Sequence, residues 1–271
     1  MDKWKRSARL VDMTQLLLSQ PYKLIPLTTF AERYLSAKSS ISEDLAIIHE
    51  VIHNEGNGEL ETLAGAAGGV RYIPKVNKAY ADDILSALCK RLSDPKRILP
   101  GGFLYLSDLL GDTTLIQDIG RIFATLFRGQ KIDAVMTVET KGIPLAHATA
   151  SFLRVPVVIA RYDYRVTEGS VVTVNTVSLT SKRMRQLSLS KRSLAEGSRV
   201  LIIDDFMKAG GTVQGMIHLL NEFQAEVVGV GVMMEAPAVE RVVDQYVSLT
   251  SVKTMDIKNQ RVEVEFGNFQ L

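Results

Sequence analysis

The segment from Val200 to Thr212 constrains the fold more than any other part of the chain. It reads Val-Leu-Ile-Ile-Asp-Asp-Phe-Met-Lys-Ala-Gly-Gly-Thr. A short unbroken apolar run predicts a strand buried on both faces, as in a parallel sheet covered by helices. Asp204 and Asp205 then fall at the carboxyl edge of that sheet, where open α/β sheets bind ligands. The segment therefore predicts an α/β domain with two carboxylates at its binding edge.

The loop after these carboxylates suits a phosphate group. Gly210 and Gly211 allow a tight turn and leave backbone N–H groups accessible, and Thr212 is expected to open an amphipathic helix. A phosphate bound there would meet the positive end of the helix.

A second loop of similar character lies about sixty residues earlier. The apolar run 133–138 is followed by Glu139, Thr140, Lys141 and Gly142, and then by Ile143-Pro144, with proline in a position typical of the first helical turn. Further apolar runs at 155–160 and 227–234 alternate with helical patterns. This alternation predicts a doubly wound parallel sheet.

The first seventy-odd residues follow a different pattern, with three helices before two short strands. The first helix carries Leu10, Met13 and Leu17, the second follows Pro26, and the third is expected to open at a capping box, Ser40 to Glu43. Strand-like segments at 58–63 and 69–73 flank a glycine-rich turn. The order predicts a winged helix-turn-helix, and the alternative is a helical dimerisation cap. We therefore expect two domains, residues 1–74 and 75–271.

Basic residues cluster where a winged helix would meet double-stranded DNA. The third helix would enter the major groove at its start, and other basic side chains would meet phosphates. The expected contacts are Arg6, Arg9, Lys38, Ser39, Ser40 and Arg71, with Lys3 and Lys5 nearby. The net charge of +2 excludes a uniformly basic surface but leaves room for such a local patch.

The remaining features favour a protein of the cytoplasm. Cys89 is the single cysteine, so no internal disulfide can form, and a reducing compartment is expected. We find no secretory signal and no apolar run long enough to cross a bilayer, and therefore expect no membrane partner.

One short motif suggests another chemistry. His49-Glu50-Val51-Ile52-His53 matches the zinc-protease pattern. The two histidines flank the apolar stripe of the third helix, and a third ligand, Glu59, would have to reach back from the following strand. We interpret them as solvated helix residues and predict no metal site.

Two loops resemble those of type I phosphoribosyltransferases. The segment 204–212 is similar to their phosphoribosyl pyrophosphate (PRPP) loop, and 139–142 to their pyrophosphate loop. The resemblance implies that the two carboxylates hold the ribose hydroxyls and that a mobile hood corresponds to 162–192. The implied effector-binding residues are Phe103, Thr140, Lys141, Gly142, Asp204, Asp205, Phe206, Met207, Lys208, Ala209, Gly210, Gly211 and Thr212. Phe103 is a candidate aromatic wall of the pocket or, as a lone aromatic, a core residue. Phe206 could stack on a base or serve only in packing.

The PRPP-like loop departs from that of an enzyme at two positions. Related purine transferases commonly carry a small or acidic residue in place of Lys208 and a threonine in place of Ala209. An ammonium group has no lone pair to accept a proton, and alanine has no hydroxyl for the phosphate. We therefore expect binding without turnover and no catalytic residues. The alternative is an active purine phosphoribosyltransferase with an appended domain.

Nearly the whole chain resembles the purine operon regulators of Gram-positive bacteria. The most specific stretches are 9–12, 37–45, 65–69 and 204–212. The resemblance implies a homodimeric transcription factor on purine-gene control sites, with PRPP as effector, no required cofactor, and purine nucleotides such as ppGpp as competitors. Repression or activation, the presence of Mg²⁺ with the ligand, and the role of the basic loop 182–192 stay open. Tyr162 departs from the family, where a basic residue is expected.

Overall fold

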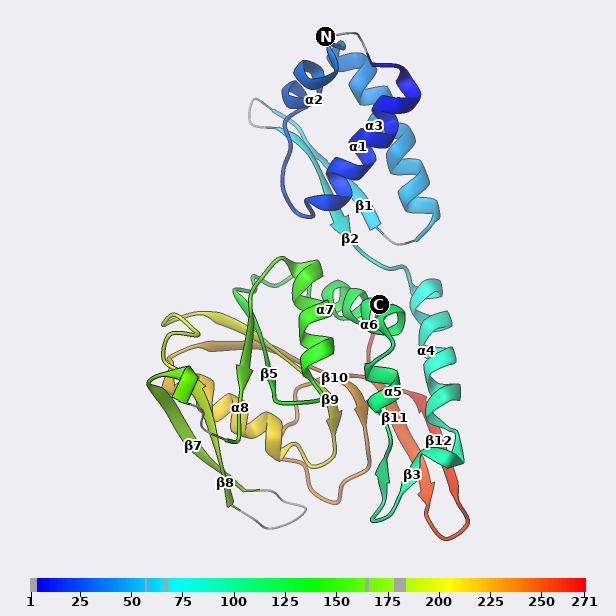
Figure 1. The fold of residues 1–271 in the computed structure, drawn as a ribbon. Helices are drawn as coiled ribbons and strands as arrows, with labels where there is room; N and C mark the ends of the chain where they lie inside the picture. Colours follow the sequence, from blue (N-terminus) through cyan, green and yellow to red (C-terminus); the bar gives the residue numbers. More distant parts are fainter. Residues whose placement is uncertain (1–3, 57, 66–67, 164–165, 178–183) are drawn as a thin grey trace. The chain divides into compact units, whose positions relative to one another are not determined.

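The computed structural model describes residues 4–56, 58–65, 68–163, 166–177 and 184–271 (Figure 1). The chain divides into two compact units, Met1–Tyr80 and Ala81–Leu271. The division falls within helix α4 (Lys78–Leu92), a few residues after the predicted boundary. No described helix has the length and apolar character needed to cross a membrane.

The first unit is a winged helix, as predicted. Helices α1 (Arg6–Ser19), α2 (Leu27–Tyr34) and α3 (Lys38–Asn54) precede strands β1 (Gly58–Leu63) and β2 (Gly69–Pro74), which pair antiparallel. Its core is apolar, because the inward faces of the helices pack on the inner face of the hairpin. The core residues are Met13, Leu17, Ile25, Phe30, Tyr34, Ile41, Leu45, Ile48, Ile52, Leu60, Val70 and Tyr72.

Helix α3 does not begin where the capping box predicts. Its first residue is Lys38, its N-cap is Ala37, and no side chain caps it. The Ile41 N–H already donates to the Ala37 carbonyl at 3.1 Å, and the Ser42 hydroxyl donates to the Lys38 carbonyl at 3.0 Å. Ser40 therefore lies inside the first turn, and the predicted capping box was wrong.

The second unit contains the predicted parallel sheet. Its order is β12-β11-β10-β9-β5-β6, and only β12 runs antiparallel to its neighbour. The strands are β5 (Ala134–Val138), β6 (Val157–Ala160), β9 (Arg199–Met207), β10 (Glu226–Glu235), β11 (Val247–Asp256) and β12 (Arg261–Phe266).

Helices cover both faces of this sheet (Figure 1). Val200 and Ile202 of β9 pack in a core with α8 (Gly211–Glu222). Gly231 of β10 lies against two side chains, Ile203 of β9 and Phe123 of α6 (Thr113–Leu126). Helix α6 packs on α7 (Ile143–Leu153). Successive residues of β9 thus face opposite helix layers, which explains the unbroken apolar run.

Two hairpins complete the second unit. Strands β7 (Val171–Val177) and β8 (Met184–Ser190) pair antiparallel and pack on α8, where Gly215 lets Thr176 and Leu187 come close. The sequence analysis treated 162–192 as a mobile hood and did not predict these two strands, and Lys182 and Arg183 lie outside the described residues. Strands β3 (Ile98–Leu99) and β4 (Phe103–Leu104) precede the short helix α5 (Ser107–Leu110).

Candidate functional site

The paired carboxylates of β9 are buried. Asp204 is 3% exposed and Asp205 is 9% exposed. The apolar run ends at Ile203 and suggested a solvent-open loop at the two carboxylates, and this was wrong, because β9 continues to Met207 and pairs with β10 as far as Glu235. The ladder hydrogen bonds extend the strand beyond the point where the two charged residues suggested a turn.

Burial controls the ionisation of this pair. Desolvation raises the pKa of Asp204 well above its usual value, and the neighbouring Asp205 carboxylate raises it further. Desolvation also raises the pKa of Asp205, although a hydrogen bond from Asp204 and the charge of Lys141 oppose the increase. The Asp205 N–H donates to the Asp204 Oδ1 at 3.0 Å. Ligands that donate hydrogen bonds or bring positive charge would stabilise the ionised forms.

The loop between β5 and α7, which contains residues 139–142, comes close to Asp204. A β-carbon on Gly142 would lie 2.8 Å from the Asp204 Oδ1 and 2.1 Å from the Thr137 Oγ1, so only glycine permits this approach. Thr140 and Lys141 are exposed beside it.

Thr137 is a feature that the sequence analysis missed. It lies in β5, is fully buried, and its hydroxyl has no hydrogen-bond partner among the described residues. The sequence signal was a single hydroxyl side chain in the otherwise apolar strand that precedes Gly142.

The loop that follows β9 leads directly into a helix N-terminus. Gly210 has a φ of +85° and is the N-cap of α8, which begins at Gly211, one residue before the expected Thr212. Lys208 is exposed and Ala209 is half-buried. Met207 is 2% exposed and packs in the core, so its predicted contact with a ligand is limited to the main chain.

The two predicted aromatic contacts lie in different places. Phe206 is half-buried at the end of β9. Phe103 is 65% exposed on the β3–β4 hairpin, where Gly102 lies against Ile257 of the β11–β12 turn. No contact in the described part of the chain joins Phe103 to the loop after β9, so its role as a wall stays a prediction.

Arginines tie the loop at 139–142 to the hood region. The Arg161 Nη1 donates to Glu139 at 2.6 Å, and Arg161 also lies 3.4 Å from Glu168. The Arg185 guanidinium lies over the Tyr162 ring at 3.7 Å from its centroid. Tyr162, the departure from the family, therefore provides an aromatic face for a cation of β8.

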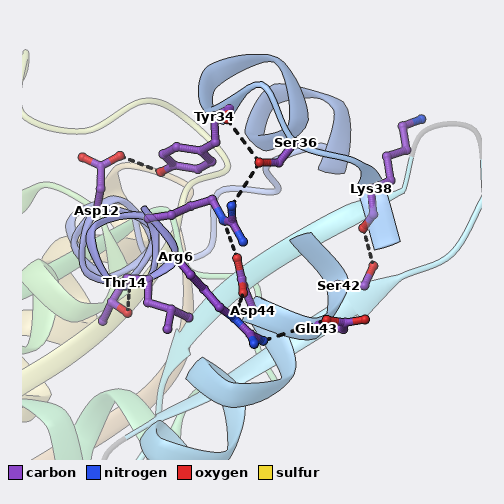
Figure 2. Close-up of polar contacts among 11 residues, drawn as sticks. Arg6, Asp12, Thr14, Tyr34, Ser36, Lys38, Ser42, Glu43 and Asp44 are labelled. Carbon is purple, nitrogen blue, oxygen red and sulfur yellow. Dashed lines mark hydrogen bonds and ion pairs between the residues drawn. The ribbon is translucent and has the colours of Figure 1, made fainter. Parts of the chain in front are cut away.

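In the winged helix, the start of α3 presents the groups expected to meet DNA. Lys38 and Ser39 are exposed and Ser40 is half-buried. The Lys38 side chain extends away from the polar cluster beside it (Figure 2), and it has no ion-pair partner among the described residues. The uncapped N-terminus of α3 leaves backbone N–H groups available to an anion.

Arg9 is turned inward rather than toward DNA. It is 6% exposed, and its guanidinium bonds Asp44 of α3 and, at 3.0 Å, the Ser36 hydroxyl. Arg6 donates to the other Asp44 oxygen at 2.9 Å but remains about half exposed (Figure 2). Because the fully buried Asp44 needs a counter-charge, a phosphate contact of Arg9 would require this ion pair to break.

The basic residues of the wing are also paired. Arg71 donates to Glu61, its direct cross-strand neighbour, at 2.7 Å, and Lys75 donates to Glu59 at 2.9 Å. Arg71 could meet a phosphate only by giving up or sharing this ion pair. His49 and His53 are exposed and stacked on each other at 6.0 Å, in agreement with solvated helix residues.

Comparison with known proteins assigns both units. Residues 5–74 match the family "Bacterial purine repressor, N-terminal", and residues 107–267 match the family "Phosphoribosyl transferase domain". The purine biosynthesis transcriptional repressor PurR of Bacillus subtilis (strain 168) is 56% identical over 98% of this chain and 94% of its own length. The chain belongs to the PurR family of purine biosynthesis transcriptional regulators.

Relatives within and beyond this family differ in their described activity. The PurR of Lactococcus lactis subsp. lactis (strain IL1403), a transcriptional activator, is 44% identical over 97% of this chain and 98% of its own length. A xanthine phosphoribosyltransferase of Limosilactobacillus fermentum is 39% identical over 51% of this chain and 73% of its own length. Relatives of this chain thus include a repressor, an activator and an enzyme.

Proposed function

We propose that this PurR-family regulator senses PRPP in its phosphoribosyltransferase-like unit and does not turn it over. The observation that carries the proposal is the buried Asp204-Asp205 pair, which lies between two loops suited to anions. Gly142 of the loop 139–142 lies beside Asp204, and the chain continues from Asp205 into the loop before α8. PRPP carries a pyrophosphate, a diol and a 5-phosphate. The three groups correspond to loop 139–142, the carboxylates, and the N-terminus of α8.

The chemistry of the carboxylates fits such a ligand. Two buried carboxylates with raised pKa values are stabilised when hydroxyl groups donate to them or when a divalent cation enters with the pyrophosphate. Mg²⁺ is a hard cation that prefers such oxygen ligands, so Asp204 and Asp205 are the residues that would face it. A purine nucleotide such as ppGpp offers the same phosphate chemistry and would compete for the site.

Lys208 argues against catalysis. Its exposed ammonium lies one residue after β9, where a transferase would need a group that can take a proton from the purine. A cation at this position instead attracts phosphate oxygens and strengthens binding without chemistry.

An active transferase is the second candidate, favoured by the 39% identity to a xanthine phosphoribosyltransferase. Incubation of the protein with PRPP and each purine base separates the two proposals. We expect no release of pyrophosphate above background. Turnover on the order of 1 per second would instead establish an enzyme.

The pocket is tested by changing both carboxylates to alanine. The Asp204→Ala/Asp205→Ala variant should lose its response to PRPP and retain affinity for DNA, because the two units are compact separately. An unchanged response would place the effector elsewhere. Glu222→Ala, at the exposed far end of α8, is a control that should respond as the wild type does.

For DNA, we propose that a homodimer places two α3 helices on one duplex. Lys38 and Arg6 would neutralise phosphates, while Ser39 and Ser40 read bases or bind a phosphate at the helix start. Arg9 is left out because Asp44 and Ser36 occupy it. Scrambling one half-site of a control region should then lower the affinity.

A further inference from the structure

A third buried carboxylate of the second unit lies on the strand next to the Asp204-Asp205 pair. Glu235 is the last residue of β10, is 8% exposed, and pairs with Met207 of β9. Tyr246 donates its hydroxyl to the Glu235 Oε2 at 2.6 Å, and Ser248 donates to the Oε1 at 3.0 Å. Arg241 supplies the third donor at 2.5 Å from the Oε2. Each oxygen therefore has a protein partner, and the charge is compensated within the fold.

These contacts hold the segment that follows β10 in one conformation. The second terminal nitrogen of Arg241 donates to the Ala236 carbonyl at 3.0 Å, and its guanidinium lies 5.1 Å from the Tyr246 ring centroid. A planar guanidinium with three fixed neighbours has little freedom left. Arg241 is thereby a rigid point in a segment without helix or strand.

The residues that follow Arg241 directly contact the loop between β9 and α8, residues 208–210, which we call the phosphate loop. The Val242 N–H donates to the Ala209 carbonyl at 3.0 Å. The side chain of Val243 packs against Gly210, with its Cγ2 3.2 Å from the place that a β-carbon on Gly210 would occupy. The conformation of Ala209 and Gly210 therefore depends on where Arg241 places its two successors.

The phosphate loop needs such external support. Gly210 has a φ of +85°. A glycine can adopt many other conformations, and most of them would not direct the backbone N–H groups at the N-terminus of α8 toward one ligand atom. A loop that must be ordered during binding lowers the affinity by the free energy of that ordering. A loop already held in place avoids this loss.

We propose that Glu235 is a positioning residue for the effector. It lies on the neighbouring strand and acts through Arg241, which sets the segment 241–243 that in turn supports Ala209 and Gly210. The inference rests on the proposed function, in which this loop holds the 5-phosphate of a phosphoribosyl ligand. Glu235 is not expected to affect the pyrophosphate loop at 139–142.

The test uses the full-length chain and titration calorimetry with two ligands, PRPP and inorganic pyrophosphate. Glu235→Gln keeps the shape and removes the charge. Arg241→Lys keeps the charge but replaces the two terminal nitrogens that contact Glu235 and the Ala236 carbonyl with one. Both variants should bind PRPP about tenfold more weakly, the effect of a loop that must be ordered on binding. Both should bind pyrophosphate as the wild type does. Glu265→Gln, which removes an exposed partner of Lys253 on β12, is the matched control and should change neither affinity.

The outcomes separate the inference from the function beneath it. Wild-type protein that fails to bind PRPP would overturn the proposed function itself. Wild-type binding together with undiminished PRPP affinity in Glu235→Gln would overturn only the positioning role. Equal losses for PRPP and pyrophosphate in both variants would also overturn it, because they would show general damage to the unit rather than a local effect on the phosphate loop.

Discussion

Removing the buried charge of Asp44 should destabilise the winged-helix unit more than any change to its surface charges. Asp44 is fully buried and is the partner of Arg9, which is itself only 6% exposed. Asp44→Ala leaves the Arg9 guanidinium buried with one remaining partner, the Ser36 hydroxyl. Breaking a buried ion pair from one side costs about 3–5 kcal/mol, since an uncompensated charge stays behind.

That magnitude is a large fraction of what the unit has available. A unit of about 80 residues has a free energy of unfolding of roughly 4–12 kcal/mol. With an m value of about 1–2 kcal/mol per molar urea, the loss should lower the urea midpoint of the unit by about 1.5–5 M.

The chain provides its own probe for this unit. Trp4 is the single tryptophan and packs edge-on against Tyr34, with ring centroids 5.5 Å apart. Its fluorescence therefore reports on the first unit and not on the second. Glu43→Gln is the control, because Glu43 is exposed and 3.9 Å from Arg6, and exposed pairs contribute little.

A second variant tests the physical reason. Arg9→Met/Asp44→Leu replaces the buried pair with apolar side chains of similar size and should recover most of the lost stability. The reasoning is refuted if Asp44→Ala moves the midpoint no more than Glu43→Gln does. It is also refuted if the double variant is as unstable as the single one.

Three further predictions concern the sites. Burial raises the pKa of Asp204 in the folded protein above its value in the unfolded chain. The folded state therefore becomes less stable as the pH rises from the unfolded pKa through the folded pKa, and Asp204→Asn should be more stable than the wild type at neutral pH in thermal scans. Lys38→Ala should reduce the slope of log affinity for DNA against log salt by about 1, and exposed Lys258→Ala in the other unit should not, as binding at several salt concentrations will show. Gly142→Ala would place a β-carbon 2.1 Å from a buried hydroxyl and should abolish PRPP binding in calorimetry, whereas Gly129→Ala, with open space around it, should bind normally.

The overall fold was predictable because its signals are local. The run Val200 to Ile203 alternates between two helix layers, and only a strand covered on both sides can bury all four side chains. The three amphipathic helices and the glycine-rich turn likewise specify a winged helix within a short stretch of chain. Patterns of this kind depend on neighbours in sequence.

Features whose partners are distant in sequence could not be predicted. No residue near Arg9 in the sequence indicates that its partner is Asp44, 35 residues away. The ion pair between Arg71 and Glu61 likewise depends on the register of the hairpin, and the phosphate contact of Arg71 stays a prediction. The burial of Asp204 and Asp205 depends on pairing with β10, so the strand continued past the two charges that suggested its end.

The most direct test of the account is a titration of full-length protein against a purine-gene control duplex, with and without PRPP, at one stated salt concentration. We predict salt-dependent binding in both cases and an affinity that PRPP changes in the wild type but not in Asp204→Ala/Asp205→Ala. An affinity that PRPP leaves unchanged in the wild type would contradict the proposed link between the phosphoribosyltransferase-like unit and DNA binding.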